Sequence, residues 1–168
     1  MEIDNSEAHT GAKSLRIVGI NATGTPAHTT VRHDSVSVEN GSSYTIAFWA
    51  KVDLKEGQSR EVDVSVRMQQ GDPWPGFYSK AIVLDSTDWK EYTDTFVMEA
   101  DVVEGVWVGL SVAQSDMDFW IDDFRFFEGG PSDEIRQVET AVSPMGKLPI
   151  SWGGIKDRHR SSYTADSS

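Results

Sequence analysis

The chain has 168 residues, of which 38% are hydrophobic and 10% aromatic, and its formal net charge is −12. This length predicts one domain with a tail. The sequence has no run of about 18 consecutive apolar residues, so no membrane-spanning helix is expected. The absence of cysteine excludes disulfides, a thiol nucleophile and cysteine-ligated metals. The acidic balance repels phosphate backbones, so nucleic acid is not an expected partner.

The charge divides the chain into two parts. Residues 1–130 contain 10 Lys or Arg and 22 Asp or Glu, whereas residues 131–168 contain five of each. The segment Met1–Asn5 has no basic and apolar signal region, and Met1 is interpreted as a start added to a fragment of a larger protein. Residues 1–130 are predicted to form the domain, and residues 131–168 a partly disordered linker or tail with one possible docking piece around Leu148–Ile155.

Apolar and polar residues alternate with a period of two between clusters of turn-forming residues, and helix signals are almost missing. Such a pattern predicts an all-β fold, namely a two-sheet antiparallel β-sandwich of the jelly-roll type. The predicted strands are Ser14–Val18, Thr30–Val38, Ser43–Val52, Glu61–Gln69, Tyr78–Leu84, Lys90–Met98, Gly105–Gln114 and Asp118–Phe127.

Alternation also predicts which side chains face the core. The inward sets are expected to be Tyr44, Ile46, Phe48, Ala50 and Val52 in one strand, Val62, Val64, Val66 and Met68 in a second, and Val106, Val108, Leu110 and Val112 in a third. Trp49, Arg67 and Trp107 then point outward. Thr30–Val38, Glu61–Gln69, Tyr78–Leu84 and Gly105–Gln114 are expected to share one sheet.

Four segments carry a resemblance to a known family. They are Glu7–Ile17 with its Gly, Lys, Ser, Leu residues, Val36–Lys51, Asp88–Phe96, and the aromatic strand Phe119–Phe127 with its Asp122-Asp123 pair. In this order and spacing they resemble the calcium-containing carbohydrate-binding modules with a galactose-binding-like jelly roll that are appended to bacterial polysaccharide-degrading enzymes. The resemblance covers roughly residues 3–129 and implies a non-catalytic module.

The resemblance implies a structural calcium ion where the first loop meets the last strand. Calcium takes six to eight oxygen ligands, carboxylate or carbonyl. The expected ligands are Glu7, the Lys13 carbonyl, and either Asp122 or Asp123, between which the sequence does not choose. The alternative is that Asp123 pairs with Arg125 or Lys90 on a solvated face. By strand parity, Asp122 is expected to share a face with Trp120, Phe124 and Phe126.

The outward face of the sheet that contains Glu61–Gln69 is the predicted binding surface. Pyranose rings stack on aromatic rings, and their hydroxyl groups bind planar polar side chains. Trp74 lies between two prolines and is expected to be preordered. Trp89 and Trp120 are expected to serve packing, and the scattered histidines have no metal-binding spacing. The predicted ligand-binding residues are Trp107, Arg67, Gln69, Trp74, Tyr78, His33 and Gln114.

Catalysis is not expected. Glu61 and Asp63 lie on one strand face as in a retaining glucanase, but Val66 stands where a second glutamate would be needed. The chain is therefore predicted to be an extracellular monomeric module that binds a polysaccharide or oligosaccharide and targets a catalytic domain of the same parent chain. The alternatives are a protein-binding or cell-surface adhesion module on the same fold, or a small glycan-active hydrolase or lyase.

Overall fold

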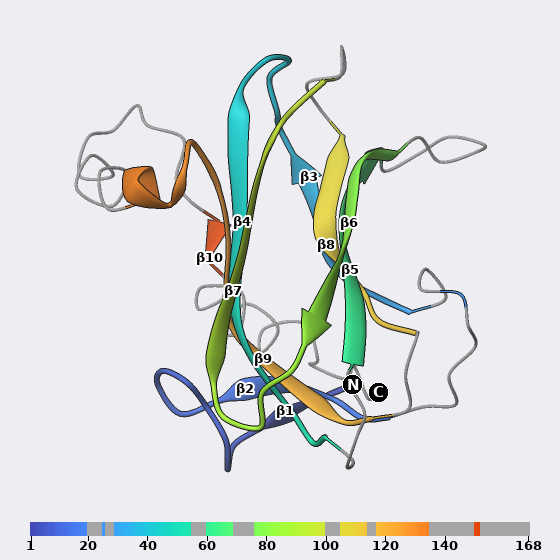
Figure 1. Cartoon of the computed structure of the whole chain (residues 1–168), viewed down its shortest axis with the longest axis vertical. Helices are drawn as coiled ribbons and strands as arrows, with labels where there is room; N and C mark the ends of the chain where they lie inside the picture. The colour runs from blue at the N-terminus through green and yellow to red at the C-terminus, as the bar shows by residue number, and fades with distance from the viewer. Residues whose placement is uncertain are drawn as a thin grey trace, which may run out of the picture.

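The computed structural model is a sandwich of two antiparallel sheets (Figure 1), as the alternation predicts. It describes residues 1–19, 25, 29–54, 60–68, 76–99, 105–113, 117–134 and 150–151. Among these residues no helix is long and apolar enough to cross a membrane.

One sheet has six strands and the other has four. The six-stranded sheet runs in the order β1 (Glu2–Asp4), β2 (Ser14–Ile17), β9 (Phe119–Glu128), β4 (Ser43–Val52) and β7 (Lys90–Val97), with β10 (Ile150–Ser151) also paired to β9. The four-stranded sheet runs β3 (Thr30–Val36), β8 (Val106–Ser111), β5 (Arg60–Met68) and β6 (Gly76–Leu84). This second sheet is the one predicted from the sequence.

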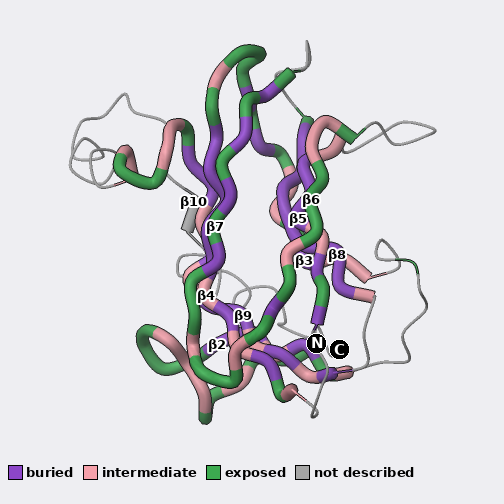
Figure 2. Tube along the Cα trace, in the orientation of Figure 1, coloured by how far each residue is buried: buried purple, intermediate pink, exposed green. Residues whose placement is uncertain are grey.

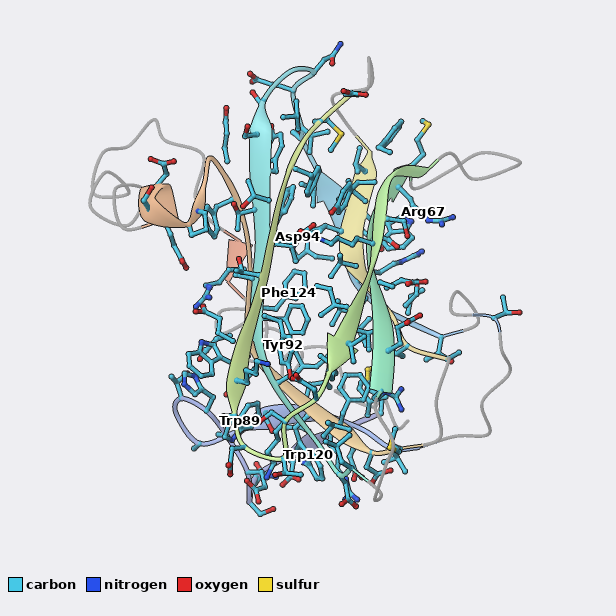
Figure 3. The ribbon with its side chains drawn as sticks, in the orientation of Figure 1. Arg67, Trp89, Tyr92, Asp94, Trp120 and Phe124 are labelled. Atoms are coloured by element: carbon cyan, nitrogen blue, oxygen red, sulfur yellow. The ribbon has the colours of Figure 1, made fainter. Side chains whose placement is uncertain are left out.

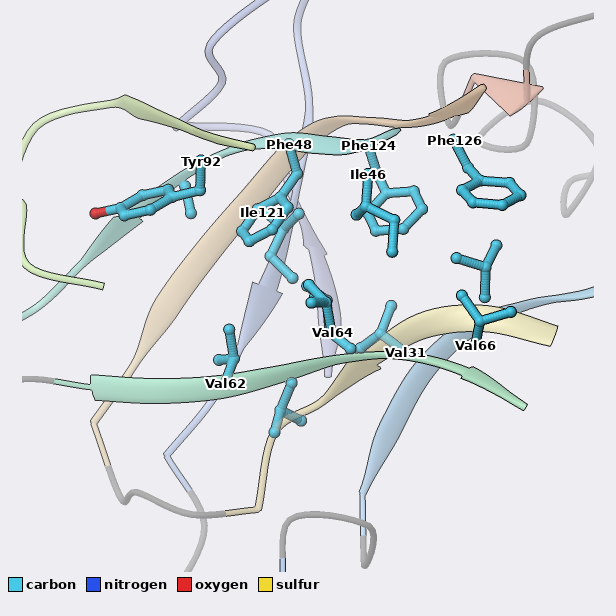
Figure 4. Close-up of a cluster of buried hydrophobic side chains, with 14 of the residues drawn as sticks. Val31, Ile46, Phe48, Val62, Val64, Val66, Tyr92, Ile121, Phe124 and Phe126 are labelled. Atoms are coloured by element: carbon cyan, nitrogen blue, oxygen red, sulfur yellow. The ribbon is translucent and has the colours of Figure 1, made fainter. Parts of the chain in front are cut away.

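The core lies between the two sheets (Figure 4). Phe48, Phe124 and Phe126 of the six-stranded sheet face Val64 and Val66 of the four-stranded sheet. The predicted inward residues of β4, β5 and β8 are buried, except that Met68 is only half-buried at the end of β5. Figure 2 shows the central strands mostly buried, while exposed and buried residues alternate along the edge strand β7.

A buried arginine closes one end of the sandwich. Arg60 is 1% exposed, and its guanidinium donates to the carbonyl oxygens of Met117 and Val112, the latter at 2.5 Å. The same group lies 4.2 Å from the centre of the Phe119 ring. Because these carbonyls accept from a charged donor, the cation can lie at the margin of an apolar core.

Strand β9 contains a bulge at Asp123. Asp123 has a φ of +47°, and two residues of β9, Asp123 and Phe124, oppose the single residue Phe48 of β4. The extra residue reverses the alternation, so that Ile121 and Phe124 both face the core. The prediction that Asp122 shares a face with Phe124 and Phe126 is therefore wrong, because parity does not continue through a bulge.

The end of the described chain returns to the sandwich. A short 3-10 helix, η2 (Pro131–Asp133), follows β9. The next residue, Glu134, forms an ion pair in which its Oε1 lies 2.8 Å from Arg125 Nε. Strand β10 pairs with Arg125 and Phe126 of β9, whereas β2 pairs with residues 119–121 of the same strand. Most of residues 131–168 lies outside the described residues, so the predicted linker stays a prediction.

Candidate functional site

The outer face of the four-stranded sheet brings Arg67 and Trp107 together. They are register partners on β5 and β8, the two central strands. The next row across the sheet consists of Arg32, Gly109, Ser65 and Ser79. Side chains of residues paired in register point to the same face, so the predicted neighbourhood of Arg67 and Trp107 is confirmed.

Trp107 faces outward but is not an open platform. Only 3% of its surface is exposed, and the guanidinium carbon of Arg32 lies 5.6 Å from its ring centre. Arg32 is held there by an ion pair of 3.0 Å between its Nε and Asp34 Oδ1. The predicted outward direction of Trp107 is thus confirmed, but a cation–π contact covers its indole.

Two backbone features bring β3 over the indole. Residues 34 and 35 form a register irregularity opposite Trp107, with Ser35 at a φ of +63°. At Gly109, a Cβ atom would lie 2.1 Å from the Val31 carbonyl oxygen and 2.7 Å from Arg32 Cα. Only glycine allows β3 to approach β8 this closely, and this approach places Arg32 over the ring.

Arg67 is a half-buried cation without an anionic partner. Figure 3 shows its side chain pointing away from the space between the sheets. It lies against Gly76, where a Cβ atom would meet Arg67 Nε at 3.6 Å. Among the residues that the structure describes, every other Lys or Arg has a hydrogen bond, an ion pair or another electrostatic partner.

The indole nitrogen of Trp107 also lacks a partner. Its Nε1 is buried and donates no hydrogen bond within the described part of the chain. Arg67 and Trp107 Nε1 are both donors without acceptor capacity. Buried donors without acceptors are costly, which makes this row of the sheet suited to receive acceptor groups from a ligand.

Two predicted ligand residues lie on the other side of this sheet. Tyr78 pairs with the core residue Val66 and points inward, where it stacks on Phe96 at 3.8 Å and its hydroxyl donates to Asp94. Burial, followed by the hydrogen bond to Asp94, raises the pKa of the Tyr78 phenol above its usual value. The placement of Tyr78 on the binding face is wrong, because it joins the two sheets instead.

His33 is the second of these residues. It pairs with Val108, a core residue, so it shares the inward side of β3 with Val31. The expectation that His33 contributes to the outer face is wrong, because alternation along β3 gives that face to Arg32. Of the remaining predicted ligand residues, Gln69, Trp74 and Gln114 lie outside the described residues.

The two acidic residues of β5 do not form a catalytic pair with a neighbouring strand. Asp63 pairs with Ala81 on one side and Ser111 on the other, and Glu61 pairs with Val83. Retaining hydrolysis needs two carboxyl groups about 5–5.5 Å apart, one of them as acid. No third carboxylate adjoins Glu61 or Asp63 in register among the described strands.

The first loop meets the predicted calcium residues Asp122 and Asp123 at the outer face of the six-stranded sheet. Asp122 is 2% exposed, and its carboxylate accepts from the backbone N–H groups of His9, Thr10 and Asp123 at 2.9–3.2 Å. Asp123 accepts from Thr10 Oγ1 at 2.7 Å and lies 2.8 Å from His9 Nδ1. The His9 ring stacks on Trp49 at 3.7 Å, so the first loop is pinned to β9 and β4.

Glu7 and Lys13 flank this corner. Glu7 Oε2 pairs with Lys51 Nζ at 2.8 Å, and the Glu7 carbonyl accepts from Ser14 Oγ at 2.6 Å. Lys13 is exposed. Within the described ranges no three His, Asp or Glu side chains converge on a possible metal position. The residues fit calcium only if backbone carbonyls such as that of Lys13 supply further oxygens.

Two residues of these sites had no role in the sequence interpretation. The sequence predicts an ordinary loop residue at His9, whereas the pairing of β2 with β9 brings its ring to Asp123. Arg32 was not singled out, and only the close approach at Gly109 reveals its contact. The histidine next to Thr10-Gly11 gave no local signal of a partner 114 residues away.

Comparison with known families identifies the chain. A family model for a carbohydrate-binding domain, CBM_4_9, matches residues 1–115. The chain belongs to this carbohydrate-binding domain family. The matched range ends before β9, which nevertheless lies in the middle of the six-stranded sheet of the carbohydrate-binding domain. A search of curated proteins found no match.

Solved structures support the fold of this domain. A structure described as "CBM4 structure and function" is 23% identical, with a TM-score of 0.57, covering 68% of this chain and 70% of that one. The CBM22-1 xylan-binding domain of Paenibacillus barcinonensis Xyn10C is 14% identical, with a TM-score of 0.50, covering 76% and 79%. The N-terminal CBM22-1-CBM22-2 tandem of the same protein is 13% identical, with a TM-score of 0.50, covering 76% and 38%. At these identities the likeness concerns the fold.

Proposed function

We propose that the domain is a non-catalytic module that binds a polysaccharide or oligosaccharide on the outer face of its four-stranded sheet. The observation that carries this proposal is the row formed by Arg67 and Trp107 on the central strands. Hydrogen-bond donors without partners face outward there, in a chain of a carbohydrate-binding family. Hydroxyl-rich ligands supply the acceptors that these donors require.

The arrangement indicates how a sugar would be held. Arg67 provides planar N–H donors, and Asp34 and Asp63 provide acceptors on the same face. If Arg32 turns away from the indole, a pyranose ring can stack on Trp107 in its place. The cation–π contact of Arg32 is then replaced by the stacking of the sugar. Such contacts on a wet, open surface give affinities on the order of micromolar to millimolar.

Affinity electrophoresis tests the proposal. Gels containing xylan, mixed-linkage glucan or another neutral polysaccharide should retard the wild-type domain, and the variants Arg67→Ala and Trp107→Ala should migrate faster. Lys90→Ala is the matched control, since Lys90 is an exposed cation on β7 of the other sheet. Equal retardation of all four proteins would place the site elsewhere, and release of reducing sugar ends would contradict a non-catalytic role.

We also propose that a structural calcium ion binds at the corner of residues 7–13 and β9. The support is chemical: Asp122 is a buried carboxylate, and none of its three backbone donors carries charge. Asp122, Glu7 and the Lys13 carbonyl would hold the ion, whose role would be to fix the loop. Thermal melting with and without chelator, with magnesium as control, tests this; an unchanged melting temperature contradicts it.

The cellular setting follows from the same function. We propose that the module belongs to an extracellular bacterial protein and holds a catalytic domain of the same parent chain near its polymer. Linking two binding or reacting units raises the effective concentration of one at the other. A comparison of polymer degradation by the parent protein with and without this module would show the effect, and equal rates on insoluble substrate would count against it.

A further inference from the structure

We propose that Arg67 selects polysaccharides that carry a carboxylate, that is, uronic acid residues. The inference rests on the proposed function and narrows it to a class of ligand. In a chain of net charge −12, cations are scarce and acids abundant, so a cation that lacks an acid partner among the described residues requires an explanation.

The pairing of the other cations makes Arg67 exceptional. Arg32 pairs with Asp34, Lys51 with Glu7 and Lys80 with Asp94. Arg125 pairs with Glu91 and Glu134, and the buried Arg60 donates to two carbonyls. Of the cationic side chains in the described ranges, Arg67 alone has no such partner, although it is half-buried. A guanidinium held partly out of water gains more from an anion than an exposed one does.

The sheet itself offers Arg67 no anion. Its register partners are Trp107 on β8 and Gly76 on β6, neither of which can accept its protons through a side chain. Asp63 lies four residues along the same strand, about 13 Å away. That distance exceeds the screening length of about 8 Å at physiological ionic strength. Asp34 is already paired with Arg32 at 3.0 Å.

The geometry favours a carboxylate over a neutral hydroxyl. A guanidinium presents parallel N–H groups that match both oxygens of one carboxylate, and charge-assisted hydrogen bonds are about twice as strong as neutral ones. Gly76 has no side chain above this position, so a substituent branching from a glycan can reach the guanidinium.

Pairs of polymers that differ only at the carboxyl group test the proposal. Glucuronoxylan, polygalacturonate and alginate are each compared with their carboxyl-reduced forms, in which –COO⁻ has become –CH₂OH, by isothermal titration calorimetry. At least one acidic polymer should bind about tenfold more tightly than its reduced form. That ratio of dissociation constants corresponds to about 1.4 kcal/mol of binding free energy. Arg67→Gln should remove this difference, so that the acidic polymer and its reduced form bind this variant equally tightly. Arg67→Lys should keep part of the difference in affinity, because lysine keeps the positive charge but lacks the parallel N–H groups of the guanidinium.

Controls separate this proposal from the general one. Lys90→Gln removes the same charge from the other sheet and should leave the ratio unchanged, and circular dichroism verifies that each variant is folded. Equal binding of acidic and reduced forms, a ratio that persists in Arg67→Gln, or equally tight binding of dextran sulfate overturns the selection of carboxylate. In those cases neutral glycan binding, and with it the proposed function, still stands. Failure to bind any polymer, neutral or acidic, refutes both.

Discussion

The outer faces of the two sheets carry similar types of residue, tryptophans and charged side chains, but differ in whether those side chains have partners among the described residues. On the six-stranded sheet, Trp49 is stacked under His9, and Asp122 and Asp123 accept from the first loop. Trp120 there donates to Asp4 at 2.8 Å. On the four-stranded sheet, Trp107 Nε1 and Arg67 have no such partner among the residues that the structure describes. Figure 3 shows Arg67 and Trp120 on different parts of the molecule.

This difference distinguishes structure from recognition better than residue type does. A polar side chain that the chain itself satisfies stabilises the fold, and replacing it costs the desolvation of the partners left behind. A side chain that the fold leaves unsatisfied contributes little to stability and is available to a ligand. Substitutions on the first face should therefore change the free energy of unfolding, and those on the second face should change binding.

The largest expected effect is at Asp122. Asp122→Ala leaves three backbone N–H groups without an acceptor in a buried site and should lower the free energy of unfolding by roughly 3 kcal/mol. Urea denaturation in chelator measures this without any contribution from calcium. Asp122→Asn, which keeps one acceptor oxygen, should lose less. A domain as stable as wild type would show that the loop is not held by this carboxylate.

The next effect tests the approach of β3 to β8. Gly109→Ala places a methyl group 2.1 Å from the Val31 carbonyl oxygen, so β3 must move, at roughly 2 kcal/mol of stability. The same movement should lift Arg32 from the ring of Trp107 and increase hydrogen exchange at the indole N–H of Trp107. NMR measures this exchange, and the Trp107 signal is assigned as the one indole signal that is missing in the variant Trp107→Phe. Ser65→Ala, at the register partner of Gly109, is the control, and unchanged stability in Gly109→Ala would contradict the close contact.

Acid should weaken the end of the six-stranded sheet where Asp118 meets β2. Burial would raise the pKa of Asp118, but the Gly19 N–H and the Arg16 guanidinium outweigh it and hold this pKa below its usual value. A lowered folded-state pKa adds stability above the unfolded value and loses it as pH falls through the folded one. The melting temperature should fall as pH drops below about 4. Asp118→Asn should flatten that decline, and an identical slope would contradict this origin.

The smallest expected effect on stability is at Arg67. Because Arg67 has no ion-pair partner among the described residues, Arg67→Gln should change the free energy of unfolding by less than about 0.5 kcal/mol, as for ordinary surface changes. Lys51→Gln, which removes a cation paired with Glu7 and packed 4.9 Å from the Trp120 ring, is the contrasting variant on the first face. A larger loss for Arg67→Gln than for Lys51→Gln would reverse the comparison between the faces.

Alternation along strands was sufficient to predict the sandwich, the members of the four-stranded sheet and most of its core. It assigned Val62, Val64 and Val66 to the core and placed Arg67 beside Trp107, because these strands keep a regular period of two. It failed where the backbone departs from that period. The left-handed residue Asp123 reverses the faces of β9, and aspartate is among the residues that adopt this conformation most readily.

Which side chains of different strands contact each other could not be predicted from the residue pattern within single strands. Whether Trp107 is open depends on how closely β3 approaches at Gly109, and whether Tyr78 faces a ligand or Asp94 depends on the register with Val66. These are distances between segments far apart in the chain, and no local pattern encodes them. The isolation of Arg67 likewise becomes visible only in the folded arrangement, where each other cation of the described residues has a partner.

The short strand β10 has a practical consequence for any shortened form of this protein. Because β2 ends opposite Phe119 and Ile121, the backbone groups of β9 near Arg125 and Phe126 would be left unpaired without Ile150 and Ser151. An open strand edge recruits strands from other molecules. Expression boundaries placed soon after Glu134 should therefore yield soluble oligomers or aggregates, and boundaries beyond Ser151 should yield well-behaved material.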